Sequence, residues 1–151
     1  PVGRKICFCL KNLLQNITQK TNVKKEANMK LLQLKRVYDQ PEDSDGFRIL
    51  IDRLWPRGLK KTDAHIDLWC KDIAPSPELR SWFHHEPERF DLFRAAYLSE
   101  LDKNPVSVQF MSDCNLLLKS SNVTLLYAAK DTTQNNATVL LKWLAEKLEQ
   151  P

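Results

Sequence analysis

Glycine is scarce in this sequence, and its scarcity excludes one class of phosphate site. Only three glycines occur in 151 residues. P-loops and dinucleotide-binding loops need closely spaced glycines so that the backbone can approach a phosphate group. Neither pattern is present, and no serine lies in the G-x-S-x-G arrangement of a nucleophile elbow. Any phosphate ligand would therefore have to be held by other groups.

The four cysteines lack the spacing of a metal site. Cys7 and Cys9 form C-x-C rather than C-x-x-C, and no histidine lies near them. Cys70 and Cys114 lie among apolar residues, so we interpret them as buried hydrophobic side chains. No cysteine lies in the C-x₅-R cradle of a cysteine phosphatase. We expect no metal ion and no cofactor, and this use of cysteine is typical of a reducing cytoplasm.

Long apolar runs are also missing, and the positive charge is unevenly placed. No run approaches the length of a membrane span, so we expect a single-domain cytoplasmic protein without a membrane partner. The formal net charge is +4, but residues 1–28 alone carry +5, which leaves −1 for the rest. A nearly neutral body does not attract a phosphate backbone, so a nucleic-acid partner is disfavoured. The oligomeric state is left open.

Residues 1–28 differ in composition from the rest of the chain. They begin without methionine, are basic, and contain apolar residues at helical spacing. Three interpretations stay open: sequence upstream of a natural start at Met29 or added in cloning, a targeting segment, or an accessory helix. We favour the first, because the patterned domain begins just after Met29. Residues 29–151 are then one α/β domain.

Strand-like and helix-like segments alternate after Met29. Strands are predicted at 31–38, 47–54 and 122–129, where short apolar runs end in polar clusters. Helices are predicted from Pro77 after a Ser76 cap, from Pro87 to about Leu101, from about 105 to 119, and from Asn135 or Asn136 to Leu148. This alternation indicates a small, mainly parallel sheet of three to four strands flanked by helices, a Rossmann-like three-layer α/β fold.

The stretch RILIDRLWPRG, residues 48–58, organises the predicted site. Its apolar half reads as a buried strand, and Pro56 and Gly58 stop the strand where Arg53 and Arg57 appear. Lys130 and Asp131 follow the last predicted strand and precede a helix N-terminus, which favours an anion. Ligands of open α/β sheets gather at the carboxyl ends of the strands. The sequence therefore predicts an anion-binding or phosphate-binding pocket at this edge.

A purely structural role for the same charges stays open. Arg53 could pair with Asp131, and Asp52 with Lys130, at the edge of the sheet. Asp131 is the best acid–base candidate, although a neighbouring lysine and a helix start should lower its pKa and make it a weak base.

Several motifs resemble those of the YeaO-like family, a branch of the bacterial DUF488 group of domains of unknown function. They are LKRVYD at Leu34, DG at Asp45, DRLWPRG at Asp52, DLWCKDIAPSPELRSWFHHEPERF at Asp67, VTLLYAAKD, and NNA around Asn136. The resemblance implies a small cytoplasmic α/β protein without an established activity. Larger relatives look as though they carry a cysteine–histidine motif after the last strand, which this sequence lacks. Carried over, the resemblance points to Arg53, Trp55, Arg57, Ser76, Arg80, His85, Lys130, Asp131 and Asn136.

Three functions remain open at this stage. The first is an enzyme, or former enzyme, acting on a small phosphorylated or nucleotide-like substrate, with Asp131 and Lys130 as catalytic candidates. In it, the other residues that the resemblance indicates bind the substrate. The second is a non-catalytic ligand-binding or nucleic-acid-binding regulatory module. The third is a structural or partner-binding protein.

Overall fold

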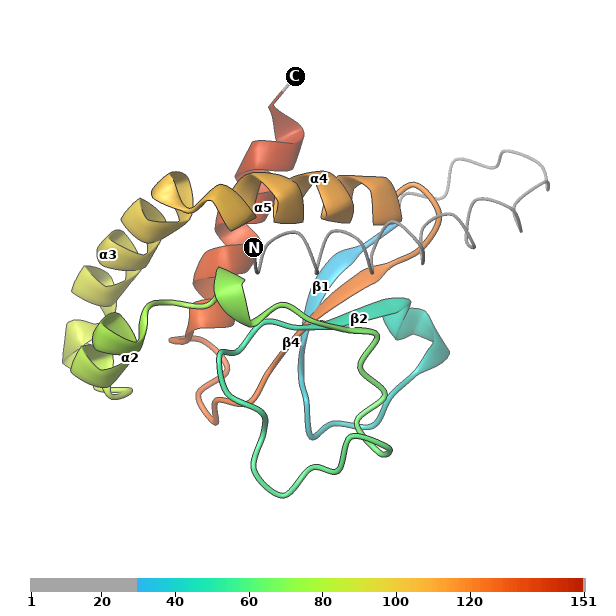
Figure 1. The fold of residues 1–151 in the computed structure, drawn as a ribbon, viewed down its shortest axis with the longest axis horizontal. Helices are drawn as coiled ribbons and strands as arrows, with labels where there is room; N and C mark the ends of the chain where they lie inside the picture. The colour runs from blue at the N-terminus through green and yellow to red at the C-terminus, as the bar shows by residue number, and fades with distance from the viewer. Residues whose placement is uncertain (1–29, 151) are drawn as a thin grey trace.

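The computed structural model describes residues 30–150, and these form an α/β fold around a four-stranded parallel sheet (Figure 1). The strand order is β1-β4-β2-β3. The strands are β1 (Leu32–Arg36), β2 (Phe47–Leu50), β3 (Leu68–Trp69) and β4 (Val123–Tyr127). The predicted α/β class with a small parallel sheet is therefore confirmed.

The helices follow the predicted starts closely. They are η1 (Asp43–Asp45), η2 (Lys71–Ile73), α2 (Pro77–Phe83), η3 (Pro87–Arg89), α3 (Phe90–Lys103), α4 (Pro105–Leu117) and α5 (Asn136–Glu149). Proline occupies the first position of α2 and α4, where its missing N–H costs nothing. Ser76, Asn104 and Asn135 cap α2, α4 and α5 with their side-chain oxygens.

Strand β4 is the centre of the sheet. It pairs with β1 from Leu32↔Val123 to Arg36↔Tyr127, and with β2 from Phe47↔Val123 to Leu50↔Leu126. All five of its residues are buried, as expected for a strand covered on both faces. Because β4 lies between β1 and β2, the turn at Asp45-Gly46 is not a hairpin.

Different parts of the chain pack on the two faces of the sheet. On one face, Ile49 and Leu125 belong to a large core that also contains the buried side chains of α2, α3, α4 and α5. On the other face, Leu50 and Leu126 pack with Trp55 and neighbouring side chains from the long segment between β2 and β3. Figure 1 shows this segment as the long loop on the side of the sheet away from α4. The loop therefore forms the third layer.

Two features of the fold differ in detail from the sequence prediction. Strand β2 ends at Leu50, earlier than Leu54, because residues 52–57 turn away to form the pocket described below. The two-residue β3 was not predicted, because the sequence around Leu68 reads as a mixed segment. The interpretation of residues 1–28 and of Met29 as the natural start lies outside the described residues. Within 30–150 no helix has the length and apolar character that a membrane crossing requires.

A buried ion pair lies at the amino end of the sheet. Asp45 and Arg48 are 2% and 5% exposed and form a salt bridge. Lys35 donates to Asp45 Oδ1 at 3.0 Å, which places two cations on one carboxylate. These contacts and the N–H of Glu42 lower the pKa of Asp45 against the opposing effect of burial.

Candidate functional site

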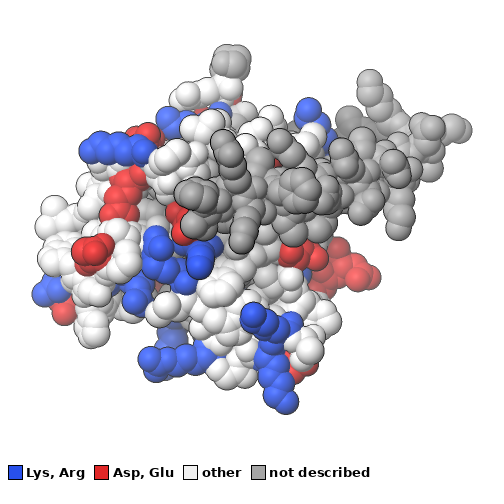
Figure 2. Space-filling model, viewed as in Figure 1, with Lys and Arg blue, Asp and Glu red and all other residues white. Residues whose placement is uncertain are grey.

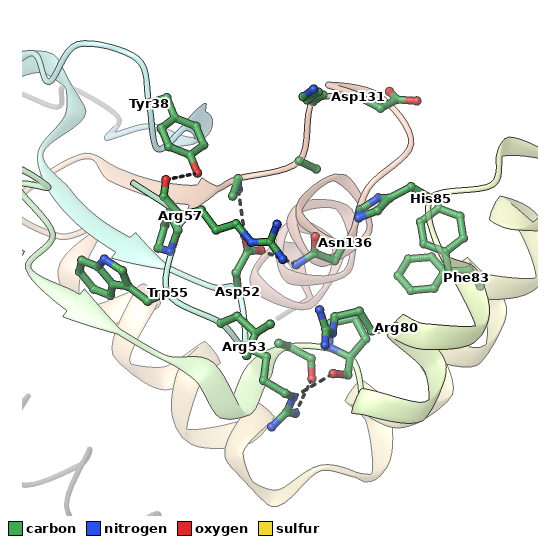
Figure 3. Close-up of a pocket in the computed structure, with 18 residues that line it drawn as sticks. Tyr38, Asp52, Arg53, Trp55, Arg57, Arg80, Phe83, His85, Asp131 and Asn136 are labelled. Carbon is green, nitrogen blue, oxygen red and sulfur yellow. Dashed lines mark hydrogen bonds between the residues drawn. The ribbon is translucent and has the colours of Figure 1, made fainter. Parts of the chain in front are cut away.

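A pocket of about 620 Å³ lies at the carboxyl ends of β2 and β4 (Figure 3). Four parts of the chain supply most of its lining: residues 52–57 after β2, residues 74 and 75 before α2, α2 with the turn that follows it, and residues 128–131 with the start of α5. Tyr38 after β1 and Phe93 of α3 complete it. These parts meet here because parallel strands end at one edge of the sheet. This is the edge at which the sequence predicts a pocket.

Asp52 lies at the centre of this pocket. Its Oδ2 accepts the N–H of Ala128 at 2.8 Å, and its Oδ1 accepts Nδ2 of Asn136 at 3.0 Å. Burial raises the pKa of Asp52, while these two hydrogen bonds and the charges of His85 and Arg80 oppose the rise. A single carboxylate thus connects the exits of β2 and β4 to the start of α5.

Three exposed cations line the same pocket as this carboxylate: Arg57, Arg80 and Lys130. Across residues 30–150, none of the three forms a salt bridge with an acidic side chain. In Figure 3 the side chain of Arg57 extends across the pocket on the side of Asp52 and Asn136. Figure 2 shows Lys and Arg side chains gathered between α2 and the long loop, and acidic side chains at the other end of the sheet.

Arg53 has a different position from the one expected for a ligand-binding side chain. Its Nε and Nη2 donate to the carbonyl oxygens of Pro75 and Ala74 at 3.2 and 3.3 Å. Its Nη1 lies 3.9 Å from Asp72 Oδ1. Arg53 therefore fixes the segment before α2, which is one wall of the pocket. The pairing of Arg53 with Asp131, considered from the sequence, does not occur.

Trp55 lines the pocket, and it also packs with Leu50 and Leu126 on the face of the sheet that the long loop covers. Its Nε1 donates to the carbonyl of Leu59 at 2.7 Å. Its ring packs edge-on against the ring of Trp69, with the ring centroids 5.4 Å apart. Trp69 in turn donates to the backbone carbonyl of Asp52 at 2.7 Å. The two indoles thereby fix the backbone that carries the central carboxylate.

Ser76 caps α2 and is not part of the pocket lining. Its hydroxyl accepts the N–H of Leu79 at 3.2 Å and donates to Oε1 of Glu100 at 2.6 Å. The other oxygen of Glu100 accepts the N–H of Ser76 at 2.9 Å. Ser76 thus fixes α2, which carries Arg80, to α3.

Asp131 is occupied by its own loop at the edge of the pocket. Its Oδ1 accepts the backbone N–H groups of Thr133 and Gln134 at 2.8 and 3.0 Å, and the hydroxyl of Thr133 at 2.9 Å. The bond from Gln134 is the largest of the effects that lower the pKa of Asp131. A lowered pKa makes a carboxylate a weak base, as the sequence suggests, although the main cause is the loop hydrogen bonds.

His84 and His85 follow α2 in an unusual backbone conformation, and His85 lines the pocket. Their φ angles are 45° and 57°, in the left-handed region that residues other than glycine seldom adopt. This turn brings the ring of His85 to 5.6 Å from the ring of Phe83, at the edge of the pocket. Backbone strain of this kind is concentrated at functional sites in other proteins.

Comparisons with known proteins agree with the motifs in the sequence. Residues 31–151 match a family model described as the inactive DUF488-N3 subclade. The chain belongs to this family. The YeaO-like, DUF488 assignment made from the sequence motifs is therefore confirmed.

Similar proteins come from several bacteria. The chain is 52% identical over 113 residues to the uncharacterized protein YeaO of Escherichia coli (strain K12), a match that covers 75% of this chain and 96% of that protein. It is 41% identical over 109 residues to the uncharacterized proteins Mb3100c of Mycobacterium bovis and Rv3073c of Mycobacterium tuberculosis, which covers 72% of this chain and 89% of each relative. No solved structure matches the chain significantly.

The structure brings together most of the residues to which the resemblance to the DUF488 family points. Residues 53, 55, 57, 80, 85, 130, 131 and 136 all line the pocket. Their roles in binding or catalysis stay predictions. No group of three or more potential metal ligands occurs within residues 30–150.

The sequence does not single out Asp52 as the central side chain of the pocket. The sequence predicts Asp52 among the polar groups at the exit of the second strand and as a possible partner for Lys130, and the pairing with Lys130 does not form. The signal was nevertheless present, since Asp52 directly follows the buried apolar run and precedes Arg53. The contribution of Phe93 to the lining is not predicted either, because its place on the apolar face of a helix is that of a core residue.

Proposed function

We propose that this DUF488 domain binds a small molecule with an anionic group such as phosphate, and that it does so without catalysing a reaction. The observation that carries the proposal is that Arg57, Arg80 and Lys130 line one pocket and that none of them forms a salt bridge with an acidic side chain in the described part of the chain. Exposed guanidinium groups bind phosphate in a bidentate manner.

The size of the pocket fits such a ligand. Small-molecule sites usually have volumes of about 300–1,000 Å³, with a mainly apolar lining and a few convergent polar groups. This pocket has about 620 Å³, with Phe83 and Phe93 among its apolar walls. The volume suits a mononucleotide or a sugar phosphate.

Two observations favour binding without turnover. The matching family is described as inactive. In addition, the carboxylate of Asp131 is held by hydrogen bonds within its own loop and has a lowered pKa. A carboxylate in this state does not readily accept a proton.

An enzymatic function is the second candidate, and Asp52 is the reason. A partly buried carboxylate with a raised pKa inside a pocket is the usual environment of a general acid or base. In that reading Asp52 would act in place of Asp131. Incubation with phosphate esters, followed by product analysis, separates the two candidates: we expect no product. Turnover that is lost in Asp52→Asn would favour the enzyme.

Calorimetric titration with inorganic phosphate and with AMP tests the binding proposal. We expect saturable binding that weakens about tenfold or more in Arg80→Ala and in Arg57→Ala, since hydrogen bonds to charged groups contribute about 1.5–3 kcal/mol. Arg94→Ala is the matched control, because Arg94 is a half-exposed arginine of α3 that pairs with Asp91 at 3.5 Å, outside the pocket. The absence of saturable binding, or an equal loss in the control, would refute the proposal.

A further inference from the structure

The pocket has two chemically different ends. The carboxylate of Asp52 lies partly buried at its floor, whereas Arg57, Arg80 and Lys130 are exposed at its rim. A ligand that was only an anion would gain from the rim and be repelled by the floor, because like charges at short range cost free energy. The floor therefore selects for a ligand that presents hydrogen-bond donors to Asp52.

The free acceptor positions of Asp52 define those donors. An ionised carboxylate has about four lone-pair positions, two on each oxygen. Ala128 uses one position on Oδ2, and Asn136 uses one on Oδ1. Asp52 has no salt bridge to any residue within 30–150. Each oxygen thus keeps capacity for one further donor, which suits two donors held side by side.

We infer that the ligand is a phosphate ester with a vicinal diol, of the ribose phosphate type. The two hydroxyl groups donate to the two oxygens of Asp52, and the phosphate reaches Arg57, Arg80 and Lys130. Carboxylates that bind the hydroxyl groups of ribose at the ends of parallel strands are a common device of α/β folds. This inference rests on the proposed function and adds the nature of the ligand's second end.

The apolar wall is consistent with this orientation. Phe83 and Phe93 stack on each other with ring centroids 4.2 Å apart, and both line the pocket. Both rings are almost fully buried, so they back the apolar lining, and Leu54, which is 57% exposed, is the lining residue that can contact the carbon face of a sugar ring.

Matched ligands test the inference on the unaltered protein. The probes are ribose 5-phosphate, 2-deoxyribose 5-phosphate and inorganic phosphate, titrated by calorimetry at constant ionic strength. We expect ribose 5-phosphate to bind about tenfold more tightly than its deoxy analogue, which lacks one donor of the diol. Because this comparison needs no mutation, it does not depend on the folding of a variant.

The variant Asp52→Asn provides the second test. We expect the preference for ribose over deoxyribose to disappear and the binding of inorganic phosphate to become tighter, because the negative charge at the floor is removed. A purely structural role for Asp52 would leave the ratio of the two sugar affinities unchanged. Asp91→Asn is the matched control, since Asp91 is 87% exposed on α3.

The outcomes separate this inference from the proposed function. Equal affinity for the two sugar phosphates in the unaltered protein, together with saturable and Arg80-dependent phosphate binding, would overturn the inference and leave the anion pocket intact. Failure of all three probes to bind would overturn both.

Discussion

Replacement of Asp52 by alanine tests whether this carboxylate holds the pocket together. The substitution removes the acceptor for the N–H of Ala128 and for the side-chain amide of Asn136. Each hydrogen bond to a charged group contributes about 1.5–3 kcal/mol. Water can enter the open pocket and satisfy part of the loss, and the cost of burying a charge disappears. We therefore expect a net loss of about 2 kcal/mol in the free energy of unfolding.

Urea denaturation followed by circular dichroism measures this loss. With a slope of about 1–3 kcal/mol per molar urea, a loss of about 2 kcal/mol lowers the midpoint by about 1 M. Asp52→Asn retains an oxygen that accepts the N–H of Ala128, and the amide of Asn136 can rotate to form a hydrogen bond with the new side chain. We therefore expect a smaller loss in the free energy of unfolding, of about 1 kcal/mol. A change below about 0.5 kcal/mol in Asp52→Ala would show that the three segments do not depend on this carboxylate.

The pH dependence of the same comparison has a definite sign. Because burial raises the pKa of Asp52, the folded protein binds this proton more readily than the unfolded chain. The cost of the buried charge is absent below the ordinary aspartate pKa and appears as the pH rises through the raised value. The stability advantage of the parent over Asp52→Ala should therefore shrink as the pH rises across this range. An advantage that grows with pH would refute the reasoning.

Three further substitutions have expected effects on the urea midpoint. Asp45→Ala should lower the free energy of unfolding by about 3–5 kcal/mol, because it leaves the buried charge of Arg48 without its carboxylate. A loss below about 1 kcal/mol would contradict a buried ion pair. Gly46→Ala should be destabilising by more than about 2 kcal/mol, since its Cβ would lie 2.1 Å from the carbonyl oxygen of Asn122 at a φ of +64°; unchanged stability would contradict this close approach. His84→Gly should stabilise by about 0.5–1 kcal/mol, because glycine relieves the left-handed conformation of an exposed residue; a loss would show that the imidazole has a packing role.

Much of this fold could be predicted because its signals are local. Proline at the start of α2 and α4, with a capping residue before each, marks a helix start in the sequence alone. The apolar run of β4 is as long as a central strand requires, and all of it is buried. Parallel strands then bring their carboxyl ends to one edge, so the position of the pocket also follows from the pattern.

The orientation of individual side chains could not be predicted in the same way. Arg53 and Arg57 are similar in sequence context, yet Arg53 binds two backbone carbonyls of the segment before α2 while Arg57 extends across the pocket. Asp52 meets Asn136, which lies 84 positions away. Strand β3 consists of two residues, and it exists because Leu68 and Trp69 pair with β2 rather than because of a local pattern. Such contacts depend on tertiary structure.

The most direct measurement of the central claim is a backbone NMR titration of the full chain with inorganic phosphate. If the cations at the carboxyl edge form an anion site, saturable shifts should appear in residues 53–57, 80–85 and 128–136, with one common dissociation constant. The Arg94→Ala control should reproduce these shifts, and Arg80→Ala should weaken them about tenfold. An absence of shifts in these three segments, or saturable shifts confined to the amino end of the sheet around Arg48, would contradict the claim.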